Sequence, residues 1–521
     1  MKNYQQQLST LIHDLPIKAG VFGDVSGILI SGVQSDSRLV KPGDLFVCLS
    51  GGNTDGHKYI SNAIQAGAVA VIGSQAIDSL TVPYIRVADT REALAWFSAG
   101  LYDHPGRKLT VIGVTGTDGK TTTSNLLYQI LKTAGLQAGL ISTVNAMIGN
   151  DVIDTGFHVT TPEAPDVQRY LALMVEAGLT HMVLETTSHG LAQHRVTGCE
   201  YDIAVVTNVT HEHLDYHGTY DAYLQAKGKL FEHLAVTGKK ERGNYYFGVL
   251  NADDRSYDYL KDLVKDNFVS YSVDGKGIVN AENIQPMEDG IDFTVKGQGF
   301  SVPVHCPIPG MFNVSNSLAA FCAAVSGLGI APELAARGIA ALPGVPGRME
   351  VIDLGQDFTA IVDFAHTPNA LKVALDAVRP MTKSRVIAIF GSAGLRDREK
   401  RKMMADVSVR NADITILTAE DPRTESLDGI LAEMAGAAVT AGGVEGQTFF
   451  RVPDRGDAIR MGVKLAKPGD LVVACGKGHE QSMCFGTVEY PWDDRIAMRA
   501  ALGELLGKET EQMPRLPTHQ E

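Results

Sequence analysis

A glycine-rich segment between an apolar run and a helical pattern constrains the fold of this chain more than any other feature. Residues 113–123 read Gly-Val-Thr-Gly-Thr-Asp-Gly-Lys-Thr-Thr-Thr, after the apolar run 109–114 and before the helical pattern 121–132. In a strand–turn–helix of this kind, backbone N–H groups and the positive end of the helix dipole face one point. We therefore predict a phosphate-binding loop at the edge of an α/β sheet.

The residues after the last glycine of this loop indicate which anion it binds. Lys120 can reach the β- and γ-phosphates of a nucleoside triphosphate, and the Thr121 hydroxyl can ligate Mg²⁺. The loop departs from the common pattern, because Val114 stands where the first glycine is expected and Gly113 lies one residue earlier. The alternative interpretation is a tight strand–helix turn that binds no ligand.

Composition restricts the partners and the compartment. The chain has 521 residues, enough for about three domains. Its formal net charge of −14 argues against nucleic acid or an anionic membrane as a partner. The six cysteines form no C-x-x-C pair, which favours free thiols in a reducing compartment. The N-terminus shows no signal pattern and no apolar run has the length of a membrane span, so we expect a cytoplasmic protein without stable membrane insertion.

Proline- and glycine-rich segments divide the chain into three predicted domains. The segments 104–107 and 343–347 mark boundaries, which gives domains 1–106, 107–343 and 344–521. Apolar strands alternate with helical patterns throughout, so the fold class is α/β. We expect a small N-terminal α/β domain, a central mostly parallel sheet with flanking helices, and a C-terminal Rossmann-like domain. Residues 275–304 alternate more tightly and predict antiparallel β-structure, whereas the polar tail after 506 is expected to be loose.

Two clusters of polar residues follow predicted strands of the central domain. Glu185 ends the strand 181–185, where ligands of a parallel sheet bind, and can hold Mg²⁺; the alternative is a helix cap. The segment 208–218 contains three histidines and two acids. We favour Mg²⁺ over zinc there, because no second cluster has metal-ligand spacing, and surface histidines are the alternative. Lys227 lies in the helical stretch 220–234, and spacing alone favours a solvated lysine.

Three loops of the C-terminal domain combine arginines with carboxylates. The segments 391–398, 420–423 and 476–480 follow the predicted strands 386–390, 414–417 and 471–475. Because these strands belong to one parallel sheet, the loops should cluster at one edge. Arginine beside carboxylate suits a zwitterionic ligand such as an amino acid, and ordinary salt bridges between loops are the alternative.

The motifs, taken in order, resemble those of the Mur ligases, the ATP-dependent amino-acid ligases of peptidoglycan precursor synthesis. The resemblance spans nearly the whole chain and is strongest to the members that add the third residue of the stem peptide. It rests on Asp36-Ser37-Arg38 with 42–46, on 115–122, Thr160-Thr161-Pro162, Gln193-x-Arg195-Val196, 310–316, 346–350, 363–368 and 476–480. The loop Thr-Gly-Thr-x-Gly-Lys-Thr is the variant of this family, which accounts for the displaced first glycine.

The resemblance implies a role for each matching residue. Catalysis and metal binding would involve Lys120, Thr121, Glu185, His213 and Lys227, with Lys227 carbamylated by CO₂. ATP would contact Gly116, Thr117, Asp118, Gly119, Lys120, Thr121, Thr122, Asn313, Asn316, Arg348 and Asp363. UDP-N-acetylmuramoyl-L-alanyl-D-glutamate would contact Ser37, Thr160, Thr161, Thr187, Gln193 and Arg195. The incoming amino acid would contact Arg396, Glu420, Asp421, Pro422, Arg423, Gly476 and Glu480.

The implied reaction is amide formation through an acyl phosphate, in a monomer with ATP, Mg²⁺ and no nucleic acid. Several positions depart from the family pattern, namely Asp118, Val159, Thr187 and the pair Glu420-Asp421, which replaces Asp-Asn. Arg423 favours meso-diaminopimelate as the incoming amino acid, and lysine or ornithine stays open. The rival classes are another Mur-type ligase (folylpolyglutamate or cyanophycin synthetase), a non-catalytic regulator that binds ATP or a UDP-sugar, and a P-loop hydrolase.

Overall fold

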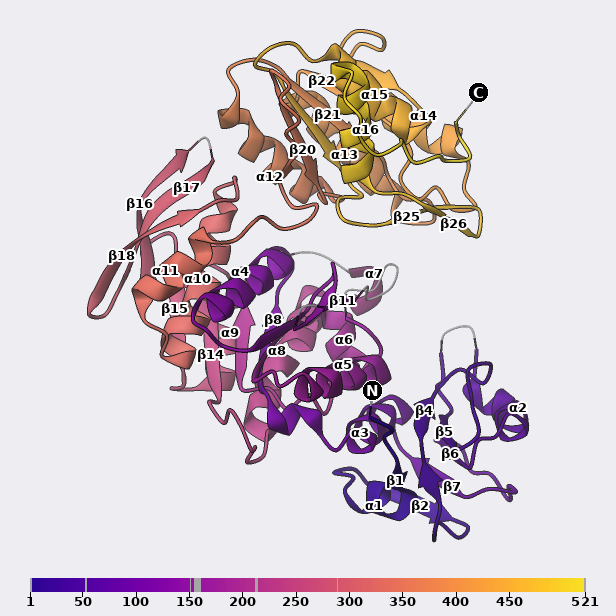
Figure 1. Cartoon of the computed structure of the whole chain (residues 1–521). Helices are drawn as coiled ribbons and strands as arrows, with labels where there is room; N and C mark the ends of the chain where they lie inside the picture. Colours follow the sequence, from indigo (N-terminus) through magenta and orange to yellow (C-terminus); the bar gives the residue numbers. More distant parts are fainter. Residues whose placement is uncertain are drawn as a thin grey trace. The chain divides into compact units, whose positions relative to one another are not determined.

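The computed structural model describes residues 2–51, 54–149, 151–153, 161–210, 214–287 and 289–519, with 214 and 215 described by their backbone alone. Figure 1 labels the helices and strands, and the contacts between residues divide the chain into two compact units. The first comprises Met1–Asn280, Lys296–Phe300 and Leu318–Gly338, and the second comprises Ala281–Val295, Ser301–Ser317 and Ile339–Glu521. Strands and helices alternate in both units, which confirms the predicted α/β class. None of the helices in the described part of the chain has the length and apolar content needed to cross a membrane.

The N-terminal sheet has the order β2-β7-β6-β5-β4, with β2 antiparallel to β7 and the other pairs parallel. The short strands β1 (Gln6–Gln7) and β3 (Leu29–Ile30) pair separately. Helices α1 and α3 share one apolar core with the sheet, and α2 belongs to a second core. The bounds are β2 Ala19–Phe22, β4 Gly32–Gln34, β5 Asp44–Val47, β6 Ala70–Gly73, β7 Tyr84–Val87, α1 Leu8–His13, α2 Ile60–Gln65 and α3 Thr90–Leu101.

The central sheet has the order β11-β10-β9-β12-β8-β13-β14-β15, and β16, β17 and β18 continue it. All pairs from β9 to β15 are parallel, whereas β10 is antiparallel to β9 and β11. The mostly parallel sheet is therefore confirmed. The bounds are β8 Thr110–Thr115, β9 Ala138–Ile141, β10 Ala146–Ile148, β11 Asp151–Ile153, β12 His181–Glu185, β13 Ile203–Val206, β14 Phe247–Asn251, β15 Phe268–Ser272, β16 Val279–Met287, β17 Gly290–Gly297 and β18 Phe300–Cys306.

Helices pack closely on this sheet because glycine replaces larger residues within the strands. A Cβ added to Gly113 of β8 would lie 2.7 Å from Leu230 of α8, and one on Gly139 of β9 would lie 2.6 Å from Met174 of α5. Helix α4 contacts β8, β9 and β12. The bounds are α4 Lys120–Thr133, α5 Ala164–Glu176, α6 Ser188–Ala192, α7 Leu214–His217, α8 Tyr220–Val236, α9 Tyr257–Val264, α10 Phe312–Cys322 and α11 Pro332–Ala340.

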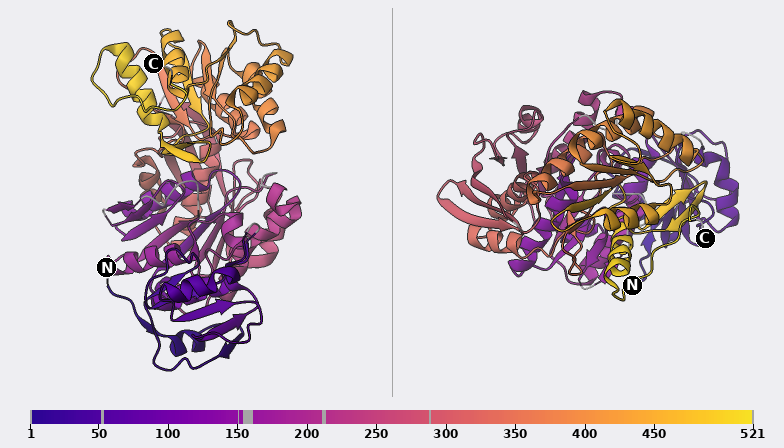
Figure 2. Two further views of the ribbon diagram at one scale, coloured as in Figure 1. Left: turned by 90° about the vertical axis from the view of Figure 1, so that its right-hand side faces the viewer. Right: turned by 90° about the horizontal axis from the view of Figure 1, so that it is seen from above.

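The C-terminal sheet has the order β19-β20-β24-β21-β22-β23 and is parallel except at β19. Figure 2 shows helices on both sides of it; α15 and α16 pack together, as do α13 and α14. A hairpin of β25 (Ser482–Phe485) and β26 (Val488–Pro491) follows β24. The bounds are β19 Glu350–Val351, β20 Thr359–Asp363, β21 Val386–Phe390, β22 Ile414–Leu417, β23 Phe449–Arg451, β24 Leu471–Cys475, α12 Pro368–Val378, α13 Arg398–Asn411, α14 Leu427–Thr440, α15 Arg455–Leu465 and α16 Asp494–Leu506.

The polar tail after α16 is docked, so the expectation of a loose tail is wrong for its described residues. Leu516 is 5% exposed and belongs to the core of the C-terminal sheet, and Met513 packs against that core. Thr518 Oγ1 donates to Asp454 Oδ2 at 2.8 Å. Two isolated apolar residues in a polar segment give no periodic pattern, which is why the sequence does not reveal the docking.

Candidate active site

The glycine-rich loop joins β8 to α4 and is fastened to the segment after β13. Gly116 has φ of +151°, and a Cβ there would lie 1.8 Å from Thr207 Oγ1. The Thr117 N–H donates to the Asn208 carbonyl at 2.7 Å, and the Asp118 N–H donates to Asn208 Oδ1 at 3.0 Å. Only glycine fits at 116 without displacing this neighbour. Gly119, with φ of +81°, forms the N-cap of α4. The loop thus has the strand–turn–helix geometry of an anion site.

Lys120 and Thr121 begin helix α4, as the sequence predicts for a phosphate loop. Lys120 Nζ donates to the Thr117 carbonyl at 2.7 Å, so the ammonium lies over the loop. Thr121 is buried, and its hydroxyl donates to Glu185 Oε1 at 3.0 Å. Glu185 ends β12, which runs parallel beside β8 with Glu185 opposite Val114. The parallel register therefore brings these residues to one edge of the sheet.

Thr143 is a site residue that sequence reasoning missed. Its N–H donates to Glu185 Oε2 and its hydroxyl to Glu185 Oε1, each at 2.9 Å. Glu185 is 1% exposed, and these bonds with that of Thr121 fix both carboxylate oxygens. Thr143 follows β9, which is parallel to β12. Ligands gather at the carboxyl ends of parallel strands, and this rule applies to the segment after β9 as well as to Glu185, so it could have identified Thr143.

Lys227 is buried, not solvated as its helical spacing favours. It is 1% exposed on α8, and Nζ donates to the Gly116 carbonyl at 2.6 Å. The ammonium also lies 4.4 Å from the centre of the Tyr223 ring, and the Tyr223 hydroxyl is 3.2 Å from Thr117 Oγ1. The side chain therefore reaches the underside of the phosphate loop.

Four of the residues expected to contact the UDP-linked dipeptide converge beside Glu185, namely Thr161, Thr187, Gln193 and Arg195. Thr161 Oγ1 donates to the Glu185 carbonyl at 3.2 Å and accepts from the Thr187 N–H at 3.1 Å. Arg195 donates to the Thr161 carbonyl at 2.9 Å and to Gln193 Oε1 at 2.8 Å. Ser37 lies in the turn between β4 and β5 of the N-terminal sheet. Thr160 and His213 fall outside the described residues.

The residues expected to contact ATP from the second unit form two small groups. On α10, Asn316 Nδ2 donates to Asn313 Oδ1 at 2.9 Å, and both residues are buried. At the end of β20, Asp363 accepts from the Met349 N–H at 2.8 Å and from the Ala365 N–H at 2.9 Å. The Arg348 guanidinium lies 4.2 Å from the centre of the Phe364 ring. Asp363 thus holds the backbone that carries Arg348.

The three loops with candidate amino-acid residues meet at the carboxyl edge of the C-terminal sheet. Lys477 is fully buried, and Nζ lies 3.0 Å from Asp421 Oδ1 and 2.6 Å from Glu480 Oε2. Asp421 also accepts from the Cys484 N–H at 2.9 Å. The Gly394 N–H donates to the Asp421 carbonyl at 3.0 Å, and a Cβ on Gly394 would lie 1.9 Å from the Pro422 oxygen. One lysine is therefore shared by two carboxylates.

The positions of the arginines in these loops differ. Arg423 is half-buried and has φ of +55°; its N–H donates to the Cys484 carbonyl at 3.1 Å. Arg396 is exposed in the loop before α13. The backbone of Arg423 is thus fixed by the β25–β26 hairpin, a strand pair that the sequence analysis did not predict.

Glu420 is a buried carboxyl in the loop that follows β22. It is 7% exposed, and a Cβ on Gly476 would lie 2.4 Å from its Oε2. Among the described residues, Oε2 has no hydrogen-bond partner. Burial raises the pKa of Glu420 to about 7, although Lys400 and Arg455 oppose the shift. The folded protein therefore holds a proton here that an exposed glutamate would have lost.

We expect Glu420→Gln to remove a pH-dependent destabilisation. In the unfolded chain the pKa of this carboxyl is about 4.3. Between that pH and about pH 7, the folded state therefore binds more protons than the unfolded state. The proton that Glu420 holds in the folded state raises the free energy of unfolding. This contribution is complete below the unfolded pKa and is lost as pH rises to about 7. Unfolding of both proteins, followed at about pH 5 and 8, should show the variant gaining up to roughly 3 kcal/mol relative to wild type. Glu399→Gln, which changes an exposed glutamate of α13, is the control, and parallel profiles of Glu420→Gln and wild type would refute the shift.

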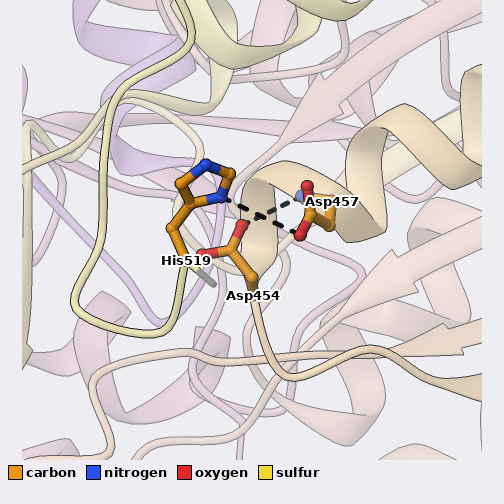
Figure 3. A group of neighbouring side chains, drawn as sticks. All are labelled: Asp454, Asp457 and His519. Carbon is orange, nitrogen blue, oxygen red and sulfur yellow. Dashed lines mark hydrogen bonds and ion pairs between the residues drawn. The ribbon is translucent and has the colours of Figure 1, made fainter. Parts of the chain in front are cut away.

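A further group of ligand-type side chains lies near the C-terminal tail. Asp454, Asp457 and His519 place potential metal-ligating atoms within 4.8 Å of one another (Figure 3). Asp454 caps α15 by accepting from the Asp457 N–H at 3.0 Å, and Asp457 accepts from Arg460 at 3.0 Å. His519 Nδ1 is 4.0 Å from Asp457. These contacts account for the cluster as an attachment of the tail.

Comparison with known proteins gives matches over most of the chain. Models described as the Mur ligase family, catalytic domain, the Mur ligase middle domain and the Mur ligase, glutamate ligase domain match residues 29–102, 114–324 and 347–478. A UDP-N-acetylmuramyl-tripeptide synthetase of Roseiflexus sp. (strain RS-1) is 43% identical over 91% of this chain and 95% of its own length. A UDP-N-acetylmuramoyl-L-alanyl-D-glutamate–2,6-diaminopimelate ligase of Geobacillus thermodenitrificans (strain NG80-2) is 40% identical, with the same coverage.

A solved structure agrees with these matches. It is that of a UDP-N-acetylmuramoyl-L-alanyl-D-glutamate–2,6-diaminopimelate ligase, 30% identical, with a TM-score of 0.66 over 95% of this chain and 98% of that one. The chain belongs to the Mur ligase family. Within that family it is an ATP-dependent acid–amino-acid ligase, which confirms the class that its motifs predict.

Proposed function

We propose that this chain joins a diamino acid, with meso-diaminopimelate favoured, to UDP-N-acetylmuramoyl-L-alanyl-D-glutamate at the expense of ATP. The observation that carries the proposal is the meeting of Thr121 and Glu185 beside the phosphate loop, in a chain whose relatives are named for this reaction. The product is a precursor of peptidoglycan. The cytoplasmic location, the monomeric state and the domain limits at 106 and 343 stay predictions.

The reaction requires two anions to approach each other. A carboxylate oxygen of the substrate's D-glutamate attacks the γ-phosphorus of ATP, and the bond from that phosphorus to the β,γ-bridging oxygen breaks to release ADP. The amine of the diamino acid then attacks the acyl carbon, phosphate leaves, and the amine loses a proton. The Lys120 ammonium, at the start of α4, offsets the negative charge that accumulates in the first step. Thr161 and Arg195 would hold the dipeptide beside it.

The donors at the edge of the central sheet suit Mg²⁺. Thr121 supplies a hydroxyl oxygen and Glu185 a carboxylate, and both are ligand types that this hard cation prefers. The bonds from Thr143 fix the Glu185 carboxylate in one orientation. When bound, Mg²⁺ neutralises charge on the phosphate oxygens. His213 and Lys227 complete the proposed ligand set, on the family resemblance alone.

Carbamylation of Lys227 would turn a buried cation into an anion. The neutral amine attacks CO₂, an N–C bond forms, and a proton leaves the nitrogen, which gives a carbamate of charge −1. The position of Lys227 supports this proposal, because its buried side chain ends beneath Gly116, next to the phosphate loop.

The charges of the C-terminal loops fit a ligand with both signs of charge. Arg423 and Arg396 supply cations, and Glu480 supplies a carboxylate that shares Lys477 with Asp421. Meso-diaminopimelate carries an ammonium and a carboxylate at each end and can use both. Lysine and ornithine lack the distal carboxylate, so they would leave one arginine without a partner.

The test is a reaction in which each substrate is omitted in turn. Purified protein receives ATP, Mg²⁺ and the UDP-dipeptide with diaminopimelate, lysine or ornithine, and ADP and product mass are measured. We expect ADP only when dipeptide and amino acid are both present, with diaminopimelate the best acceptor. Phosphate release without an acceptor would indicate a P-loop hydrolase. Absence of any turnover would favour a non-catalytic regulator, and turnover with folate or arginyl–aspartyl substrates would favour another Mur-type ligase.

A further inference from the structure

Arg401 is a buried arginine to which the proposed reaction gives no role. It lies on α13 and is 0% exposed. Its guanidinium donates to Glu425 through both terminal nitrogens, at 2.7 Å and 2.6 Å. It also donates to Glu433 at 3.3 Å and to the carbonyl of Ala393 at 3.3 Å. A planar bidentate pair of this kind fixes direction as well as distance.

The contacts of Arg401 join two loops that we name loop A (391–397) and loop B (418–426). Ala393 belongs to loop A, and Glu425 belongs to loop B. Glu425 extends the connection, because its Oε2 also accepts from the N–H of Leu395 at 2.9 Å. The hydrogen bonds from Arg401 hold the pKa of Glu425 at about 2. The carboxylate therefore stays ionised, and the connection holds at every physiological pH.

Both loops carry an arginine of the proposed amino-acid site close to this connection. Arg396 follows Leu395 directly in loop A, and Arg423 lies two residues before Glu425 in loop B. The backbone around them is unfavourable: φ is +57° at Leu395, +40° at Asp421 and +55° at Arg423. Non-glycine residues in this region are strained and persist only where surrounding contacts hold them. The loops therefore need an external restraint, and Arg401 is placed to supply it.

We propose that Arg401 is a positioning residue for the amino-acid site, which it serves by holding loops A and B in register. Arg401 itself is fully buried and contacts no substrate. Through Ala393 and Glu425 it sets the separation of Arg396 and Arg423, and so the distance between two cations that bind one ligand. The inference rests on the proposed function.

The test separates binding of the amino acid from binding of the other substrates. We expect Arg401→Met to raise KM for diaminopimelate by about tenfold or more, because displacement of a positioned group by about 1 Å has effects of this size. KM for ATP and for the UDP-dipeptide should stay within about twofold, since loops A and B carry none of the residues proposed for them. Arg401→Lys keeps the charge but loses the bidentate geometry, so its KM should lie between those of Arg401→Met and wild type.

The matched control is Arg410→Met, on the same helix. Arg410 is exposed and pairs with Asp406 at 2.9 Å, so its loss should leave every KM unchanged. Glu425→Gln is a second variant, which keeps an acceptor for the Leu395 N–H and removes the charge; it should raise only KM for diaminopimelate. The inference would be overturned if Arg401→Met changed KM equally for all three substrates. It would also be overturned if this variant melted as wild type does and no KM changed. Failure of wild type to form product would instead refute the proposed function.

Discussion

Lys120→Met should reduce kcat for amide formation by roughly 10²- to 10³-fold, the usual effect of removing one group that stabilises charge in a transition state. The ammonium belongs to the first residue of α4 and donates a hydrogen bond to the Thr117 carbonyl of the same loop. Loss of that bond should cost little stability, because the loop is also fastened through Thr117 and Asp118 to Asn208. The variant should therefore fold and bind the UDP-dipeptide normally.

Steady-state kinetics with all three substrates, together with a thermal unfolding curve, measure this effect. Lys132→Met is the control, because Lys132 is an exposed lysine of the same helix whose ammonium lies 5.4 Å from the centre of the Tyr128 ring. It should keep wild-type kcat. If Lys120→Met retains wild-type kcat, the loop does not act on the transferred phosphoryl group.

Lys227→Met should reduce activity by roughly 10²-fold or more, because the carbamate proposed on Lys227 would hold a metal ion. Methionine has a similar length and no charge, so it can fill the buried space on α8 with little strain. Wild-type activity should fall when CO₂ is removed from the buffers and return when bicarbonate is added. Activity of the variant should not respond to either treatment.

A spectroscopic measurement distinguishes a carbamate from a merely structural lysine. With ¹³C-labelled bicarbonate, wild type should show a carbamate carbonyl signal in its NMR spectrum. Lys229→Met, a change on the same helix, should keep that signal, and Lys227→Met should lose it. A wild-type enzyme that is fully active without CO₂ and gives no signal would exclude the modification.

Local sequence patterns predict the strands of the sheets well. The runs 181–185, 386–390, 414–417 and 471–475 have the bounds of β12, β21, β22 and β24. These strands are buried throughout, and their residues are apolar apart from His181 and Glu185 at the ends of β12 and Thr415 within β22. The position of the phosphate loop follows from the same pattern, because it depends on residues that are adjacent in the chain. The strands and the phosphate loop can therefore be predicted, because each is encoded by residues that are adjacent in the sequence.

Contacts between distant segments could not be predicted in this way. The pairing of Lys477 with Asp421 depends on two strands that lie on either side of β21, and no spacing in the sequence encodes that order. Burial of Lys227 and Arg401 was equally hidden, because a charged residue in a helix is exposed by default. The β10 and β11 strands, with three residues each, are too short to give an alternating pattern. The roles of Thr160 and His213 stay predictions.

The strand order of the C-terminal sheet has a consequence for how the protein is made. Strand β24 lies between β20 and β21, yet it follows both of them, and β22 and β23 as well, in the chain. A ribosome synthesises the chain from its N-terminus, so β20 and β21 leave it before the strand that joins them exists. Until residue 475 emerges, each presents an unpaired edge of the kind that promotes association with other chains. The nascent protein therefore cannot close this sheet until β24 has been made, and both edges need protection from other chains until then.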